Sequence, residues 1–61
     1  MNERISNYII EQYIFARLYK SKLKTDVYRD AYYRRFGVNL DLSPDIVTEH
    51  IKKMIEKLSG K

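Results

Sequence analysis

The stretch Phe36-Gly37-Val38-Asn39-Leu40-Asp41-Leu42-Ser43-Pro44-Asp45 separates two helical segments of this 61-residue chain. Gly37 predicts the end of the earlier helix, because glycine readily takes the left-handed conformation that closes helices. Ser43-Pro44-Asp45 predicts the start of the next one, with a capping serine, a proline at the first helical position and an acid at the positive helix end. Residues 38–42 alternate apolar and polar side chains but have no strand to pair with, so we expect an extended connector.

Helices are expected on both sides of this stretch, and another precedes them. The first contains no glycine or proline, and Thr25-Asp26 offers a cap and a first-turn acid for the second. The third carries an apolar side made of Val47, Ile51, Met54, Ile55 and Leu58. We therefore expect an all-α domain spanning residues 1–61, with three helices over about residues 3–22, 26–36 and 44–58.

The first helix has apolar side chains on two sides. At about 100° per residue, its larger apolar face covers a little under half the circumference, and the row Ile10, Ile14, Leu18 falls outside it. A chain of this size buries only about 60% of its unfolded surface, and it has no cysteine for a disulfide. We expect a homodimer packed through this row. The alternatives are that a helix of another protein docks on the row, or that the third helix wraps round and buries it.

Positive charge concentrates in the middle of the chain, which has a net charge of +4. Between Arg17 and Arg35, seven basic residues accompany only Asp26 and Asp30. Projection places Val27 on the packing half of the second helix and Arg29 next to Tyr33 on its exposed half. A guanidinium beside a tyrosine suits phosphate and base contacts. The expected nucleic-acid contacts are Arg17, Lys20, Lys22, Lys24, Arg29, Tyr33, Arg34, Arg35, Lys52 and Lys53. The alternative is a solvated basic face in which Asp30 and Arg34 pair along the helix.

The second and third helices resemble a helix-turn-helix around Phe36-Gly37-Val38, which implies a reading helix in the DNA major groove. The sequence departs from that pattern because Asn39 to Leu42 lengthen the turn and the bulky Tyr33 stands where a small residue is expected. The third helix also carries acids, which would face phosphates. A less specific basic surface fits the sequence better.

No catalytic, metal-binding or cofactor motif is present. His50 is the single histidine, and we expect it to be half-buried and hydrogen-bonded on the third helix. Acidic pairs such as Asp45 and Glu49 stand near expected helix starts, where they complement the helix dipole. Two glycines cannot form a phosphate-binding loop of the known kinds. We expect a protein that is not an enzyme.

The function expected is binding. No apolar run approaches the roughly 20 residues of a membrane span, the first residues lack a secretion signal, and cysteine is absent, so we expect a cytoplasmic protein. The leading function is a small regulatory or accessory protein that binds DNA or RNA. The alternative is an adaptor or inhibitor that docks a partner helix on the Ile10, Ile14, Leu18 row.

Overall fold

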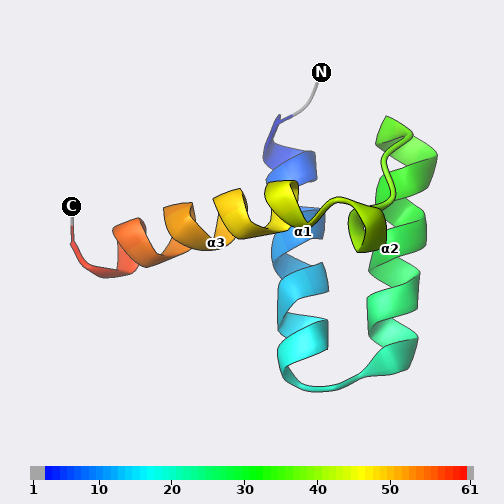
Figure 1. The fold of residues 1–61 in the computed structure, drawn as a ribbon, viewed down its shortest axis with the longest axis horizontal. Helices are drawn as coiled ribbons and strands as arrows, with labels where there is room; N and C mark the ends of the chain where they lie inside the picture. The colour runs from blue at the N-terminus through cyan, green and yellow to red at the C-terminus, as the bar shows by residue number, and fades with distance from the viewer. Residues whose placement is uncertain (1–2, 61) are drawn as a thin grey trace.

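The computed structural model describes residues 3–60, which form three α-helices and one short 3-10 turn (Figure 1). The helices are α1 (Glu3–Leu18), α2 (Lys22–Phe36) and α3 (Pro44–Leu58), and the 3-10 turn is η1 (Leu40–Leu42). The expected all-α fold is confirmed for these residues, which contain no strand. Residues 1, 2 and 61, which the expected domain includes, lie outside the described part.

α1 and α2 form an antiparallel hairpin whose turn differs from the expected one (Figure 1). α1 ends at Leu18, because Lys20 takes a left-handed conformation with φ of 58°. Ser21 then caps α2 by accepting the Lys24 N–H at 3.4 Å, so α2 begins at Lys22 rather than near residue 26. Thr25, the expected cap, instead donates its hydroxyl to the Ser21 carbonyl at 2.8 Å.

The connector between α2 and α3 is extended at Asn39, as expected, but helical from Leu40 to Leu42. Gly37 closes α2 as predicted, with φ of 70° and its N–H donating to the Tyr33 carbonyl at 2.8 Å. Asn39 then caps η1, since its side-chain oxygen accepts the Asp41 N–H at 2.9 Å. The turn buries Leu40 almost completely. The prediction of an extended connector is wrong for residues 40–42, because this local cap folds the chain and places Leu40 in the core.

The core lies mainly on α1, and it includes part of the row that the sequence placed outside it. Ile10 and Ile14 are only 4% and 6% exposed, whereas Leu18 is 69% exposed. The expectation of a free row is wrong because Leu40 joins the same cluster and Val47 and Met54 of α3 pack against it. The other buried side chains are Ile9, Tyr13, Ala16, Tyr32 and Leu40.

α3 crosses α1 and extends away from α2, so that its C-terminal half projects beyond the hairpin (Figure 1). Its main contacts are with α1 and η1. In a helix-turn-helix the two helices pack on each other, so the arrangement departs from that resemblance. α3 buries none of its side chains completely, and the expected apolar side is only half covered.

α2 is also rotated relative to its expected orientation. Tyr28, Tyr32 and Phe36 pack on the core, and the rings of Tyr32 and Phe36 lie 4.6 Å apart between centroids. Val27, which projection placed on the packing half, is exposed. The prediction for Val27 is wrong because Tyr28, Tyr32 and Phe36 make the contact between α2 and the core. Val27 lies at the far edge of the predicted packing half, outside this contact.

Candidate nucleic-acid interface

The basic residues predicted to bind nucleic acid divide into two ends of α2 and a separate pair on α3. Arg17, Lys20, Lys22 and Lys24 surround the turn between α1 and α2, whereas Arg34 and Arg35 stand in the last turn of α2. Since each helical residue adds about 1.5 Å, the ten residues from Lys24 to Arg34 separate these ends by about 15 Å. Lys52 and Lys53 lie on α3. The structure therefore does not bring all the predicted contacts together.

Arg29 is bound by acids of its own chain. Its Nη1 atom lies 2.9 Å from Asp26 Oδ1 and 2.9 Å from Asp41 Oδ2, and Nη2 lies 3.3 Å from Asp30 Oδ1. The hydrogen bond to Asp41 is the main cause that raises the pKa of Arg29. One interpretation of the sequence paired Asp30 with Arg34. In the structure Asp30 pairs with Arg29 instead. Arg29 connects α2 to η1 instead of presenting a free charge.

Lys24 and Arg35 lie on a different side of α2 from its acids, whereas Lys22 and Arg34 do not. Projection at about 100° per residue puts Asp26 and Asp30 near Arg29 and places Arg34 about 40° from Asp30, whereas Lys24 and Arg35 lie about 120° or more from both acids. Among the ion pairs found for residues 3–60, all involve Arg29. The unpaired cations of the central stretch are Arg17, Lys20, Lys22, Lys24, Arg34 and Arg35. All are exposed, so they are available to a polyanion.

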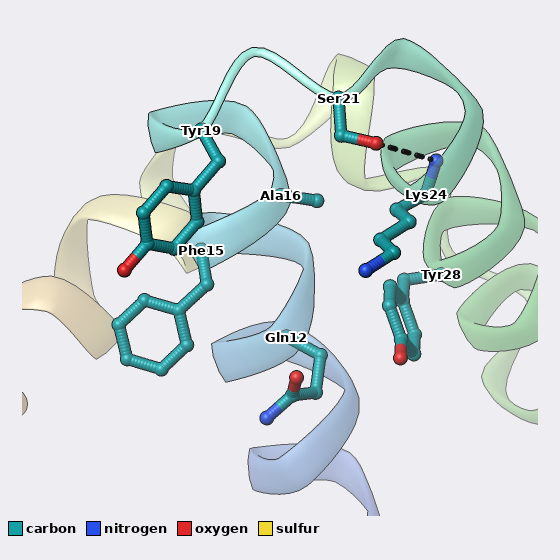
Figure 2. Close-up of a pocket in the computed structure, with 7 residues that line it drawn as sticks. All are labelled: Gln12, Phe15, Ala16, Tyr19, Ser21, Lys24 and Tyr28. Carbon is teal, nitrogen blue, oxygen red and sulfur yellow. Dashed lines mark hydrogen bonds between the residues drawn. The ribbon is translucent and has the colours of Figure 1, made fainter.

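A groove opens between α1 and α2 beside the turn (Figure 2). Phe15 reaches it from α1 and Tyr19 from the turn just after α1, while Lys24 and Tyr28 reach it from α2. Its volume is about 330 Å³, and Tyr19 at its rim is 82% exposed. The full lining is Gln12, Phe15, Ala16, Tyr19, Ser21, Lys24 and Tyr28, and we call it the aromatic groove.

The aromatic groove has the chemistry of a base-stacking site. Aromatic rings offer flat apolar faces on which a nucleobase can stack. The Gln12 amide supplies both a donor and an acceptor, and the Lys24 ammonium supplies a charge for phosphate. Arg17 does not line the groove: its guanidinium carbon lies 5.7 Å from the centroid of the buried Tyr13 ring, and Nη1 donates to the Tyr13 hydroxyl at 3.4 Å.

Sequence reasoning missed Gln12, Phe15, Tyr19 and Tyr28 as site residues. It assigned Phe15, Tyr19 and Tyr28 to helix packing, because they fall on the apolar faces of their helices. Phe15 and Tyr19 stand four residues apart just before the turn, and Lys24 and Tyr28 stand four apart just after it. This spacing could have indicated that the four side chains meet across the turn. Recognising it requires knowing that the turn lies at residues 19–21.

A second groove, between the first half of α1 and α3, has mixed charge. Glu3, Arg4 and Glu11 of α1 face Lys53 and Lys57 of α3, so acids offset the bases. Lys53 lies in this mixed groove, and Lys52 stands on another side of α3 near Glu56. Neither of these two predicted contacts therefore lies with the basic residues around the turn between α1 and α2.

His50 lines the same groove without the hydrogen bond that we expected. Its side chain is half-buried, and Nε2 has no hydrogen-bond partner among residues 3–60. Burial is the main cause that lowers its pKa below 6.5; Glu11 acts in the opposite direction, and Lys53 and Lys57 lower the pKa further. The imidazole is therefore uncharged at neutral pH.

Residues 3–60 contain no group of three or more histidine, aspartate or glutamate side chains arranged to hold a metal ion. Asp26, Asp30 and Asp41 converge, but on the Arg29 guanidinium. Within the described helices, none combines the length and apolar character that crossing a membrane would need.

Comparison of the chain with protein-family models found no match, and comparisons with curated proteins and with solved structures found none either.

Proposed function

We propose that this protein is a small regulatory or accessory protein that binds single-stranded nucleic acid at the turn between α1 and α2. The observation that carries the proposal is the aromatic groove, where Phe15, Tyr19 and Tyr28 lie beside unpaired cations. Proteins that bind single strands combine stacking rings with a positively charged path for the backbone. A base placed in the groove would stack on the rings while Lys24 contacts phosphate.

A single strand fits this surface better than a duplex. The groove holds about 330 Å³ between two helices, and a base must leave its stack to enter it. α3, the candidate reading helix, carries Asp45, Glu49 and Glu56, and acids on a groove helix repel duplex phosphates. The exposed rings can stack on bases that are not already stacked in a duplex, so the surface favours single-stranded DNA or RNA.

The second basic end of α2 extends the same surface. Arg35 shares with Lys24 the side of α2 away from Asp26 and Asp30, about 16 Å farther along the helix, and Arg34 stands next to it in the same turn. A strand that enters the groove can therefore follow this side and meet cations at both ends. The competing adaptor function loses its docking surface, because Ile10 and Ile14 are buried within the chain.

Fluorescence anisotropy with a labelled single-stranded oligonucleotide, repeated at several salt concentrations, tests the proposal. Affinity must fall as salt rises, with a log-log slope of about −0.7 for each phosphate contact on a single strand. Tyr19→Ala should weaken binding about tenfold, within the range measured for stacking contacts. Lys24→Ala should reduce the magnitude of the salt slope by about 0.7.

Matched controls separate the groove from general charge and aromatic content. Lys57→Ala removes one positive charge on α3, and Tyr8→Ala removes an exposed ring from the other groove. Both should bind nearly as the wild type does. Salt-independent binding, tighter binding to a duplex of the same sequence, or equal losses in Tyr19→Ala and Tyr8→Ala would contradict the proposal.

A further inference from the structure

α3 carries an exposed apolar stripe made of Ile51, Ile55 and Leu58. Ile55 is 60% exposed and Leu58 is 85% exposed, and Ile51 is exposed as well. These residues lie in the half of α3 that projects beyond α1 (Figure 1). Neighbouring exposed apolar side chains of this kind are where an interaction site is sought.

One flank of the stripe faces α1, and the other flank faces solvent. Met54 and His50 lie on the side that faces α1, where they are half-buried in the contact between the helices. An isolated helix of about 15 residues is marginal in water, so covering the stripe would stabilise the projecting half of α3. The partner must approach from the side away from His50.

The charges on the solvent-facing flank are self-complementary. Projection at about 100° per residue places Lys52 about 60° beyond Ile55 and Glu56 about 100° beyond it, both on the side of the stripe away from His50. When two copies of a helix pair antiparallel about a two-fold axis, each side meets its own copy. Positions 52 and 56 are equally far from residue 54, so an axis at residue 54 places Lys52 opposite Glu56 of the partner subunit, and the reverse contact forms as well.

A parallel pair would not have this complementarity. A two-fold axis along the helices brings opposite sides together, so the Lys52 side of one copy would meet the His50 side of the other. α1 already occupies that side. The antiparallel arrangement also sets Ile51 within one residue of the level of Leu58 of the partner subunit, and Ile55 lies near the axis.

We propose that the exposed stripe of α3 binds a second copy of this chain, antiparallel, with reciprocal contacts between Lys52 and Glu56 across the two-fold axis. This interface differs from the α1 row that the sequence suggested. It does not depend on nucleic-acid binding, so either proposal can fail alone.

Sedimentation equilibrium measures the mass directly, since one chain is 7.4 kDa. At about 100 µM, well above the dissociation constant of a stable homodimer, the wild type should have the mass of two chains. Ile55→Glu should have the mass of one chain. Leu23→Glu, a matched change at an exposed leucine of α2, should remain a dimer.

Charge reversal tests the register with variants that leave the apolar stripe intact. Lys52→Glu and Glu56→Lys should each weaken the dimer at least tenfold, because each places two like-charge contacts across the axis. Mixing the two variants should restore a dimer, because every such contact becomes attractive again. Circular dichroism verifies that each variant keeps its helices, and restoration on mixing cannot come from contacts within one chain.

A wild type with the mass of one chain at this concentration overturns the proposal. A dimer that persists in folded Ile55→Glu overturns it too, because the contact would then lie elsewhere. If Ile55→Glu loses its helices, the charge variants decide: no weakening in either, or no recovery on mixing, rejects the antiparallel pair.

Discussion

The Tyr13 hydroxyl donates a hydrogen bond to Oδ1 of Asp41, which joins the middle of α1 to η1. The other oxygen of Asp41 accepts from Arg29 at 2.9 Å, so one carboxylate links α1, α2 and η1. Burial is the main cause that raises the pKa of Tyr13, and the hydrogen bond from Tyr13 is the main cause that lowers the pKa of Asp41. Because η1 leads into Pro44, this link directs α3 across α1.

Replacing Tyr13 by phenylalanine removes the hydroxyl and keeps the buried ring. Tyr13→Phe should lower the free energy of unfolding by about 1.5–3 kcal/mol, the usual contribution of a hydrogen bond to a charged acceptor. Urea denaturation followed by circular dichroism measures this change. Tyr33→Phe, at an exposed tyrosine, is the control and should change stability little. Equal stability of Tyr13→Phe and wild type would show that the link contributes nothing.

Acidification should destabilise the protein through His50. Its pKa is lowered below 6.5 in the folded chain, mainly by burial, so the unfolded chain takes up a proton first. The stabilising contribution is therefore complete above pH 6.5 and is lost as pH falls through the folded pKa. Urea midpoints from about pH 7.5 to about pH 5 cover this window. His50→Gln should show a smaller decline, whereas parallel declines in the two proteins would contradict the assignment.

Gly37 should be more sensitive to substitution than Gly60. Gly37 has φ of 70° where α2 ends, and no atom would contact an added Cβ, so the cost of Gly37→Ala is conformational. It should lower the free energy of unfolding by about 1 kcal/mol. Gly60→Ala meets the same φ region, at 81°, but follows the last helix and should cost much less. Similar losses in urea denaturation would show that closing α2 is unimportant.

Local signals predicted the helices well. Gly37 and Ser43-Pro44 act on the backbone next to them, and the structure ends α2 at Phe36 and begins α3 at Pro44. The start of α2 was less determined, because Ser21 and Thr25 both suit a cap. Lys20 takes a left-handed conformation, which ends α1 and leaves Ser21 to cap α2. A lysine in the sequence does not predict that conformation.

Contacts between helices were harder to predict. A helical projection shows that Ile10 and Ile14 share a side of α1, but it does not show which element covers that side. The cover depends on η1, because its fold buries Leu40 and turns α3 so that Val47 and Met54 reach the core. The same turn leaves Ile55 and Leu58 of α3 exposed.

The candidate site was predictable in charge but not in shape. The sequence identified the basic turn through Lys20, Lys22 and Lys24, which the structure leaves exposed. It could not show that Arg29 is held by three acids, because Asp41 approaches from a different element. The aromatic groove arises only when α1 and α2 fold back on each other.

Amide chemical shifts, recorded during titration with a short single-stranded oligonucleotide, test whether the aromatic groove binds nucleic acid. In a ¹⁵N-labelled sample, the largest changes should fall on residues that line the aromatic groove, above all Gln12, Tyr19, Lys24 and Tyr28. Residues 52–58 of α3 should change little at constant protein concentration. Changes confined to α3, or no changes at concentrations where anisotropy reports binding, would show that the aromatic groove is not the binding site.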